Sequence, residues 1–381
     1  MSERLRVLFI LPSLKRAGAE NQVVQLVNGL SAERFDKHLL VFEPTMDLRD
    51  QLDDATVRFW HIPRQARFDR RLARRIAEIV DEHRIDVLHC TLQIAVLLGW
   101  QARRFASASP RLVAALHTTV NRGLKEELYD RFVYRWTLAA ADSIVFVCKA
   151  QQAYWVDRYP FVDNAATVIY NGISPDAFNP THYAEAGARL REELEIGVDA
   201  VVISCIAGFR IEKNHRGLID AFERLPSSAC LVLAGRGEQE EDVRRYVTDK
   251  GLGQRVRFVG ELSDVRPLLA ASNVSVLASF AVETFSMAML ESMSMEVPVV
   301  VTDIGGLAEA VEDGVTGLVV PVRNTGALSQ ALLSCVEDPP RLRAMGTAAR
   351  ERVVHSFSQQ AMVAETGGLL EALHAAPEQV R

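Results

Sequence analysis

The sequence predicts an α/β protein built from two doubly wound domains, in each of which helices cover both faces of a parallel sheet. Its 381 residues exceed what one ordinary hydrophobic core accommodates. Short apolar runs rich in β-branched residues alternate with longer helical patterns along the chain, which is typical of parallel sheets buried on both faces. Turn-forming residues at Tyr170–Asp176 separate these runs into two series. Such sheets bind ligands beyond the carboxyl ends of their strands, so we expect a site in a cleft between two facing domains.

The expected strands follow in order along the two series. The first series contains apolar runs at Val7–Leu11, His38–Phe42, Val87–Cys90, Leu112–Leu116 and Ser143–Val147. The second contains runs at Val201–Ala207, Ala229–Ala234, Val256–Val259, Val274–Ala278 and Pro298–Val301. A final helical pattern runs from Phe357 to Leu373. We therefore expect one domain in residues 1–172 and a second in residues 173–356, followed by this helix.

Composition excludes several classes of protein. The formal net charge of -6 argues against general nucleic-acid binding, which requires a broadly basic surface. The five cysteines are scattered and form no C-x-x-C pair, so neither a zinc site nor a disulfide framework is expected, and a reducing cytosol fits best. No run approaches the roughly 20 apolar residues that cross a bilayer. We expect a cytoplasmic protein that at most touches a membrane surface.

Two cations follow the first strand of the second series. The run Val201–Ala207 leads into a loop that carries Arg210 and Lys213. Fixed cations at this position could clamp a diphosphate and stabilise the charge that develops when a sugar–phosphate bond breaks, without a base. The alternative is an ordinary solvated pair of basic residues.

A second candidate segment follows the strand at Val274–Ala278. A loop carries Glu283, and a helix is expected to begin between Thr284 and Ser286, both of which are suitable N-caps. Amide groups at such a helix start attract anions. Glu283 can accept hydrogen bonds from sugar hydroxyls, and Glu291 can accept two from a ribose. The alternative is a pair of exposed glutamates in an acidic chain.

The surroundings of these glutamates favour the functional interpretation. Glu283-x7-Glu291 is followed by Val297–Gly306, and together they resemble the signature of retaining glycosyltransferases of family 4. Val168–Phe178 and Gly314–Pro321 resemble further segments of that family. The resemblance implies the GT-B fold, in which two Rossmann-like doubly wound domains face a cleft. It also implies that the terminal helix, within residues 357–381, returns to the first, acceptor-side domain, and that the second domain binds the nucleotide sugar.

The resemblance implies roles for individual residues. In the second domain, Glu283 would contact the donor sugar, Glu291 the ribose, Arg210 and Lys213 the diphosphate, and the backbone amides of Phe285, Ser286 and Met287 the sugar and phosphate. In the first domain, His117 would lie beside the anomeric carbon, Gly18 would allow close approach of the diphosphate, and Asn171 would contact the substrate. Without the resemblance, His117 would be interpreted as a histidine that caps a strand end. Ala17 and Gly208 depart from the family pattern, which has a glycine and an arginine there.

The implied reaction is transfer of a hexosyl unit from a UDP- or GDP-sugar to an acceptor hydroxyl with retention of configuration, in glycan, glycolipid or cell-surface polysaccharide biosynthesis. No D-x-D-type carboxylate pair or metal-ligand spacing is present, so no metal or other cofactor is expected. A nucleotide-sugar 2-epimerase of the same fold and a non-catalytic sugar-nucleotide-binding subunit remain alternatives. A dinucleotide oxidoreductase is disfavoured because no G-x-G-x-x-G opens either domain.

The acceptor side offers weaker signals. Residues 64–79 combine an arginine-rich face at Arg64–Arg75 with an apolar face that contains Phe68, Leu72, Ile76 and Ile79. Such a helix either contacts anionic lipid at the inner face of a membrane, near a lipid-linked acceptor, or packs as an ordinary surface helix. Likewise, Tyr129, Phe132 and Trp136 either stack on a sugar or form a buried helix face.

Overall fold

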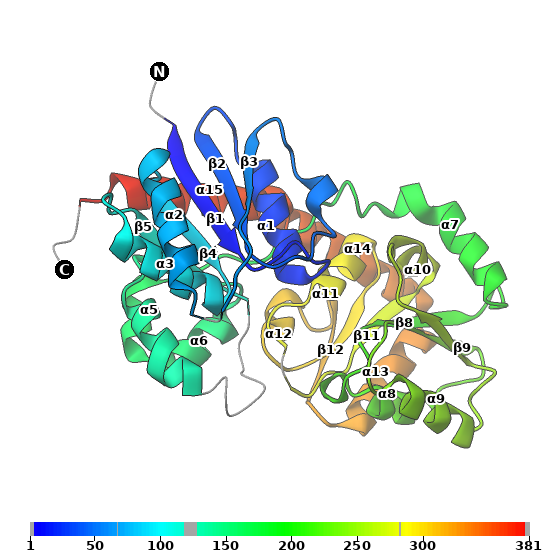
Figure 1. Ribbon diagram of the computed structural model, residues 1–381. Coiled ribbons are helices and arrows are strands. Elements are labelled where there is room, and N and C mark those ends of the chain that lie inside the picture. The colour runs from blue at the N-terminus through cyan, green and yellow to red at the C-terminus, as the bar shows by residue number, and fades with distance from the viewer. Residues whose placement is uncertain (1–3, 67, 118–127, 282, 378–381) are drawn as a thin grey trace. The chain divides into compact units, whose positions relative to one another are not determined.

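The computed structural model describes residues 4–66, 68–117, 128–281 and 283–377 of the chain (Figure 1). The chain divides into two compact units. Unit 1 comprises Met1–Gly172 and Gln359–Arg381, and unit 2 comprises Ile173–Ser358. Each unit is a parallel sheet covered by helices, so the predicted fold class of two Rossmann-like α/β domains is confirmed.

Unit 1 contains a seven-stranded sheet in the order β3-β2-β1-β4-β5-β6-β7, and all its strand pairs are parallel. The order reverses between β1 and β4, which are neighbours although two strands separate them in sequence. The strands are β1 Leu5–Leu11, β2 Phe35–Val41, β3 Val57–His61, β4 Val87–Thr91, β5 Arg111–Leu116, β6 Ser143–Phe146 and β7 Ala166–Val168. β3 and β7 were not among the expected strands, because they lack a continuous buried apolar run.

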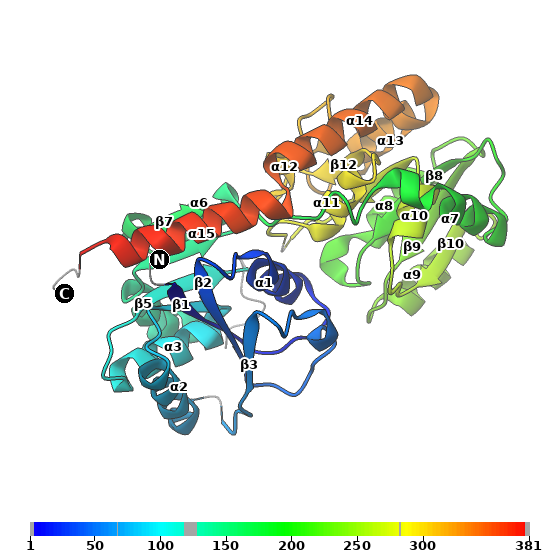
Figure 2. The ribbon, with the colours of Figure 1, turned by 90° about the horizontal axis from the view of Figure 1, so that it is seen from above.

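Helices cover both faces of the unit 1 sheet. The helices are α1 Gly18–Gly29, α2 Arg70–Glu82, α3 Gln93–Phe105, α5 Arg135–Ala139, α6 Lys149–Arg158 and α15 Gln359–Ala375, with a π-helical turn at Asp130–Tyr134. Figure 2 shows α15 on one side of the sheet and α2 and α3 on the other. The last helix of the chain is therefore part of the hydrophobic core of unit 1.

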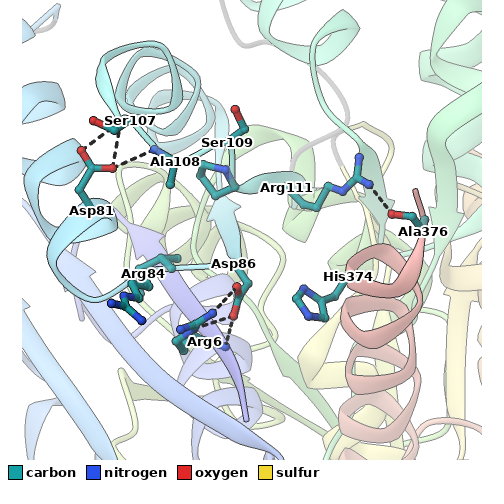
Figure 3. A pocket seen from close by; sticks show the side chains of 12 residues that line it. Arg6, Asp81, Arg84, Asp86, Ser107, Ala108, Ser109, Arg111, His374 and Ala376 are labelled. Carbon is teal, nitrogen blue, oxygen red and sulfur yellow. Dashed lines mark hydrogen bonds and ion pairs between the residues drawn. The ribbon is translucent and has the colours of Figure 1, made fainter. Parts of the chain in front are cut away.

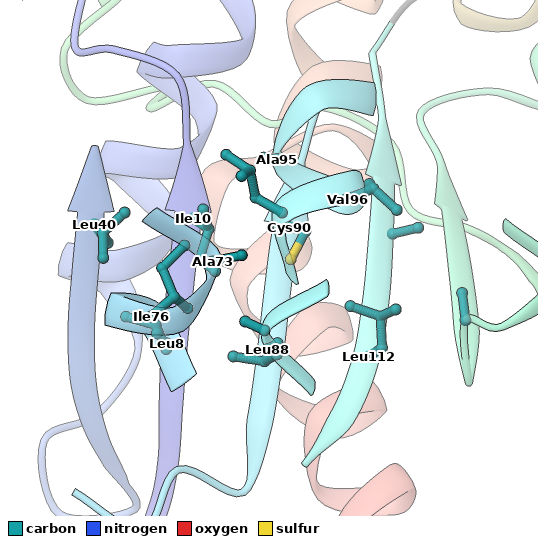
Figure 4. Close-up of a cluster of buried hydrophobic side chains, with 14 of the residues drawn as sticks. Leu8, Ile10, Leu40, Ala73, Ile76, Leu88, Cys90, Ala95, Val96 and Leu112 are labelled. Carbon is teal, nitrogen blue, oxygen red and sulfur yellow. The ribbon is translucent and has the colours of Figure 1, made fainter. Parts of the chain in front are cut away.

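Side chains of the unit 1 strands alternate between the two faces of the sheet, and each face contributes to its own hydrophobic core. Side chains two residues apart share a face of a strand. Leu8 and Ile10 of β1 pack with α2 and α3 (Figure 4), whereas Val7 and Phe9 pack with α1 and α15. Because both faces are buried, the strand reads as a continuous apolar run.

Unit 2 contains a six-stranded parallel sheet in the order β10-β9-β8-β11-β12-β13. Its strands are β8 Val201–Ile206, β9 Ala229–Ala234, β10 Val256–Gly260, β11 Val274–Leu277, β12 Val299–Thr302 and β13 Gly317–Val320. Its helices are α7 Pro180–Glu193, α8 His215–Phe222, α9 Glu240–Asp249, α10 Arg266–Ala271, α11 Met287–Ser294, α12 Leu307–Ala310, α13 Thr325–Glu337 and α14 Pro339–Ser356. The order reverses between β8 and β11, so this sheet also has a switch point.

Two expectations about unit 1 helices need correction. Phe68 does not belong to the buried face of the arginine-rich helix: α2 begins at Arg70, the carboxylate of Asp69 accepts hydrogen bonds from the Arg71 and Leu72 amides, and Phe68 is 44% exposed. Phe132 and Trp136 do not form a buried helix face, because they are 65% and 61% exposed. Arg67, within the arginine-rich segment, lies outside the described residues.

Candidate functional site

A buried ion pair lies at the carboxyl edge of the unit 2 sheet. The Lys213 ammonium contacts Oε1 of Glu283, and the two side chains are only 11% and 8% exposed. Ser279 Oγ donates a hydrogen bond to the same carboxylate oxygen at 2.9 Å. Lys213 follows β8 and Glu283 follows β11, so the pair bridges the two strands between which the order reverses. Removing either partner would leave a buried charge unpaired, which is far more costly than losing a surface ion pair.

Backbone packing fixes the loop that carries Glu283. Gly305 has a φ of +57°, and a Cβ atom there would lie 2.0 Å from the Glu283 carbonyl oxygen. The Gly306 amide donates a hydrogen bond to the Thr284 carbonyl at 2.6 Å. Glycine at position 305 is therefore required by a close approach of two backbones.

The loop that carries Lys213 is hydrogen-bonded to the segment that leads from β11 to Glu283. The Phe280 amide donates a hydrogen bond to the Glu212 carbonyl at 3.0 Å, and the Asn214 side-chain amide donates to the Ala278 carbonyl at 3.2 Å. Asn214 is left-handed, with φ 59° and ψ 39°, a conformation that asparagine tolerates better than most residues. These contacts hold Lys213 and Glu283 beside one another. Neither Ser279 nor Asn214 was predicted, because no motif in the sequence marks them.

A buried histidine adjoins the lysine. His215 begins α8, is 3% exposed, and stacks on Phe209 with ring centroids 4.3 Å apart. Burial and, to a smaller extent, the positive charge of Lys213 together lower the pKa of His215 to about 4. His215 is therefore neutral at physiological pH, and Lys213 supplies the positive charge at this point.

The predicted amides lie at the start of α11. Ser286 is the N-cap residue, and its Oγ accepts a hydrogen bond from the Met289 amide at 3.4 Å. Phe285 precedes the cap and packs on Phe357 with ring centroids 5.4 Å apart. Phe285, Ser286 and Met287 thus lie on the chain just after Glu283, where the helix dipole favours an anion.

Glu291 lies in the second turn of α11. Burial and, to a smaller extent, the negative charge of Asp264 together raise the pKa of Glu291 to about 7. Asp264 is in turn held by the Arg266 guanidinium at 2.7 and 2.9 Å. Asp264 and Arg266 carried no signal in the sequence, because their effect on Glu291 depends on a contact across the fold.

Arg210 is less tightly held than Lys213. Its side chain is 40% exposed, and its Nε lies 3.2 Å from Oε1 of Glu212. The structure therefore does not bring Arg210 into the Lys213–Glu283 pair.

Three predicted residues belong to unit 1. Gly18 is the first residue of α1, His117 directly follows β5, and Asn171 is 7% exposed in the segment after β7. Burial lowers the pKa of His117 to about 4, so its imidazole is neutral at pH 7. All three follow the carboxyl ends of unit 1 strands, the edge at which parallel sheets bind ligands.

A pocket of about 620 Å³ lies at the opposite edge of the unit 1 sheet, where β1, β4 and β5 begin (Figure 3). Four of its charged residues, Arg6, Asp81, Asp86 and Arg111, are bound to one another or to backbone. Arg6 forms a bidentate pair with Asp86 at 2.8 and 2.9 Å, and Asp81 accepts hydrogen bonds from the amides of residues 107 and 108. Arg111 donates to the Ala376 carbonyl at 2.6 Å. The Arg111 contact anchors the residue that follows α15, and the others join neighbouring loops of unit 1, so we assign this pocket a structural role.

Three further findings concern metal binding, membrane-spanning helices and cysteines. Within the described residues, no group of three or more histidine, cysteine, aspartate or glutamate side chains could hold a metal ion. No helix in that part of the chain has the length and apolar character needed to span a bilayer. All five cysteines are buried and free of disulfides.

Two family models match the chain, one for each half. The model described as Glycosyltransferase Family 4 matches residues 16–177. The model described as Glycosyl transferases group 1 matches residues 188–352. The second match includes Lys213, Glu283 and Glu291, and the first includes His117 and Gly18.

Individual proteins resemble the chain over most of its length. The N-acetyl-alpha-D-glucosaminyl L-malate synthase of Bacillus anthracis is 24% identical over 82% of this chain and 81% of its own. A GDP-mannose-dependent alpha-(1-6)-phosphatidylinositol monomannoside mannosyltransferase of Mycolicibacterium smegmatis is 28% identical over 78% of this chain and 80% of its own. The crystal structure of Anabaena HepE in complex with UDP superimposes with a TM-score of 0.85 at 22% identity, covering 97% of this chain and all of that one. This structural likeness concerns the fold.

Proposed function

Because the chain belongs to the glycosyltransferases of the GT-B fold, we propose that it transfers a hexosyl unit from a UDP- or GDP-sugar to an acceptor hydroxyl with retention of configuration. The observation that carries this proposal is the buried Lys213–Glu283 pair at the switch point of the unit 2 sheet. A lysine held at this position can stabilise a leaving diphosphate, and a carboxylate beside it can orient a sugar through its hydroxyls.

The proposed chemistry needs no separate base. The bond between the anomeric carbon and the diphosphate oxygen breaks, while the acceptor oxygen forms a bond to the same face of that carbon. The proton of the acceptor hydroxyl passes to an oxygen of the departing diphosphate. Lys213, Arg210 and the amides at the start of α11 neutralise the charge that develops, a task that a metal ion performs in other enzymes. We therefore propose metal-independent transfer, in which His117 lines the anomeric centre as a neutral group.

The remaining predicted residues of unit 2 would recognise the nucleotide-sugar donor. Glu291 would accept hydrogen bonds from the two ribose hydroxyls, and Glu283 would bind the hexose hydroxyls. In unit 1, Gly18 would leave room for the diphosphate and Asn171 would contact the substrate. The acceptor would be a sugar, a lipid-linked sugar or another small molecule, as in the synthesis of glycans, glycolipids or cell-surface polysaccharides.

A panel of ligands tests the proposal and identifies the nucleobase of the donor. The thermal unfolding midpoint is measured with UDP, GDP and ADP and with UDP-glucose and GDP-mannose, each with and without EDTA. Either the uridine or the guanosine compounds should raise Tm, because a ligand that binds only the folded state stabilises it, and EDTA should leave the shift unchanged. No shift with any of these compounds would contradict the proposal.

Analysis of the products distinguishes a glycosyltransferase from a nucleotide-sugar 2-epimerase and from a non-catalytic binding subunit. A 2-epimerase would convert the nucleotide sugar in the absence of a second substrate, and a binding subunit would give a thermal shift without turnover. The proposed transferase should release nucleoside diphosphate faster when an acceptor is added. NMR of the glycoside should show the anomeric configuration of the donor, and an inverted product would make His117 a candidate base.

We further propose that unit 1 contacts an anionic membrane surface through exposed aromatic residues. Phe132 and Trp136 are 65% and 61% exposed, and the Phe68 and Tyr129 rings lie 5.8 Å apart beside the start of α2. Arginines of α2 and of residues 131–135 lie on the same segments of the chain. Exposed aromatic and basic residues on one segment suit the interface of an anionic bilayer.

Vesicle binding tests the membrane proposal. Pelleting with vesicles of phosphatidylglycerol and phosphatidylcholine should be several-fold stronger than with phosphatidylcholine alone. Phe132→Ser with Trp136→Ser should abolish the difference, whereas Val198→Ser, which removes an 89% exposed valine of unit 2, should preserve it. Equal pelleting of the wild type with both vesicles would favour an ordinary surface helix.

A further inference from the structure

Two hydrogen bonds at the start of α11 are long. The Ser286 hydroxyl accepts from the Met289 amide at 3.4 Å, and the Leu290 amide donates to the Ser286 carbonyl, also at 3.4 Å. The usual distance between nitrogen and oxygen in such bonds is roughly 3 Å. The amides of this turn, to which the proposed function assigns the diphosphate, therefore depend on contacts with other elements to keep their direction.

Phe285, which directly precedes the N-cap Ser286, joins this turn to the end of α14, a helix that packs beside α11 (Figure 1). The Phe285 and Phe357 rings have centroids 5.4 Å apart and an interplanar angle of 57°. The two residues are only 5% and 4% exposed. Tilted aromatic pairs at this separation stabilise a structure beyond the area that they bury. The position of the Phe357 ring therefore helps to fix the turn that follows Glu283.

Arg352 of α14 holds the Phe357 ring from another direction. The guanidinium carbon lies 5.6 Å from the centroid of that ring. The same guanidinium donates hydrogen bonds to the Ala310 and Glu309 carbonyls at 2.7 and 3.0 Å, and it pairs with the Glu312 carboxylate. Because the guanidinium is a planar fork with several donors, these acceptors together fix its orientation.

Arg352 also connects α14 to α12, which leads back to the loop of Glu283. The Gly306 amide donates to the Thr284 carbonyl at 2.6 Å, and α12 begins at the next residue. From Thr284, contacts therefore run through α12 to Arg352. From Arg352 they run through Phe357 to Phe285, the residue that follows Thr284. This closed ring of contacts, here called the brace, holds two adjacent residues of the loop from two separate helices.

We propose that Arg352 and Phe357 are positioning residues for the diphosphate of the nucleotide-sugar donor. This inference rests on the proposed function and adds residues that do not touch the donor. Both act through Phe285 on the amides at the start of α11. Groups that stabilise a developing charge must be held within about 0.5 Å of their productive position. The nucleoside should depend much less on the brace, because Glu291, which would bind the ribose, lies in the second turn of α11.

The brace can be weakened without releasing the backbone. The Phe357 amide donates to the Val353 carbonyl at 2.9 Å, and the Phe357 carbonyl accepts from the Ile173 amide at 3.0 Å. Phe357→Leu therefore removes the aromatic contact and keeps both backbone bonds. The Arg352 side chain is 24% exposed, so Arg352→Gln leaves no fully buried gap. Both variants are therefore expected to fold.

Affinities for paired ligands test the inference. Calorimetry gives Kd for the nucleoside diphosphate that the thermal panel selects and for the matching nucleoside, and the wild type should bind the diphosphate more tightly. In R352Q and F357L this advantage should shrink about tenfold, because hydrogen bonds to a charged group are weakened. Kd for the nucleoside should change less than threefold. Turnover should also fall about tenfold at saturating donor, since the same amides stabilise the leaving diphosphate.

A second arginine–phenylalanine pair of unit 2 is the matched control. The Arg255 guanidinium carbon lies 4.6 Å from the centroid of the Phe222 ring, and this guanidinium donates to the Leu225 and Ala229 carbonyls at 3.0 and 3.3 Å. The pair lies at the amino edge of the sheet, where β9 and β10 begin. Arg255→Gln and Phe222→Leu should lower Tm but leave the diphosphate advantage and kcat unchanged. If the brace variants behave in the same way, Arg352 and Phe357 have only a structural role and the inference is wrong.

The double variant R352Q/F357L tests whether the two residues act through one brace. If they do, it should lose about as much of the diphosphate advantage as the more affected single variant. Losses that multiply would show that the residues act independently and would overturn the inference. Either failure would leave nucleotide binding by the wild type, and hence the proposed function, intact. Absence of nucleotide binding by the wild type would instead contradict both the proposed function and the inference.

Discussion

Both sheets reverse their strand order at a switch point, but the buried polar side chains near these two points differ in how they are paired. In unit 2, Lys213, Glu283 and Ser279 are bound to one another, and the glycines at 305 and 306 hold their loop against a neighbouring one. In unit 1, Glu20 and Thr91 are equally buried, but Glu20 Oε1 and Thr91 Oγ1 form no hydrogen bond within the described residues, and Glu20 Oε1 has only the Lys15 ammonium at 3.6 Å. A charged ligand must find its counter-charges already in place, which favours a rigid network such as that of unit 2.

This difference suggests a division of specificity. The network of unit 2 depends on residues that the sequence displays in a recognisable spacing, and it would serve any nucleotide sugar. The groups of unit 1 are few and individually unremarkable in sequence. Breaking the network of unit 2 should therefore harm turnover.

The largest effect is expected from removing the buried cation. Lys213→Met should lower kcat by about 10²–10³, because one group that stabilises the leaving diphosphate is lost. The measurement is steady-state release of nucleoside diphosphate at saturating donor. Lys250→Met is the control, since Lys250 pairs with Asp220 and Glu223 on the surface of unit 2. A change below threefold in K213M would place Lys213 outside the site.

The next effect concerns the loop that positions Glu283. Gly305→Ala should lower the free energy of unfolding by about 3 kcal/mol and reduce kcat, because the new Cβ collides with the Glu283 carbonyl. Gly251→Ala is a matched control: Gly251 also has a positive φ, of +67°, but nothing lies within 4 Å of its Cβ position. That variant should lose about 1 kcal/mol and retain kcat. Chemical denaturation of the two would show equal losses if the close approach at Gly305 were unimportant.

A smaller effect should appear in the pH dependence of nucleoside binding. With a pKa of about 7, Glu291 takes up a proton as the pH falls, and a protonated carboxyl group is a poorer acceptor for ribose hydroxyls. Kd for uridine or guanosine should rise about tenfold from pH 8 to pH 6 in calorimetry. Nucleosides are used because they lack phosphates that titrate in this range.

Glu291→Gln supplies the control for that experiment, since its nucleoside affinity should be weak and independent of pH. The same residue affects stability. Its folded-state pKa lies above the ordinary value of 4.5, so the folded protein holds an extra proton between these values. The free energy of unfolding should therefore contain a component that falls as pH rises from about 4.5 to 7 and is absent in E291Q.

The smallest effect is expected at Arg210. Because its side chain is 40% exposed and its ion pair with Glu212 lies outside the buried pair, Arg210→Ala should lower kcat less than tenfold. Direct comparison with K213M in the same assay ranks the two cations. Equal losses would show that Arg210 stabilises the leaving diphosphate as strongly as Lys213 does, contrary to this ranking.

The fold was largely predictable because continuous apolar runs mark strands that are buried on both faces. β9 occurs at the predicted residues, and β1, β4 and β8 differ from the expected runs only at their ends. β3, β7 and β13 escaped prediction because these edge strands are less buried and their patterns are weaker. The exposure of Phe132 and Trp136 could not be predicted from the sequence. Helical spacing indicates that two residues share a face of a helix, but it does not indicate whether another element packs on that face.

By itself, the sequence determined the two-sheet architecture and the positions of Lys213, Glu283 and Glu291 on loops and a helix after buried strands, because local periodicity and turn chemistry specify these features. Only the tertiary structure decided which groups meet. It paired Lys213 with Glu283, placed Asp264 near Glu291, and left Glu20 Oε1 and Thr91 Oγ1 buried without a hydrogen bond among the described residues. Charge pairing and desolvation depend on contacts between distant segments, and no local pattern encodes those contacts.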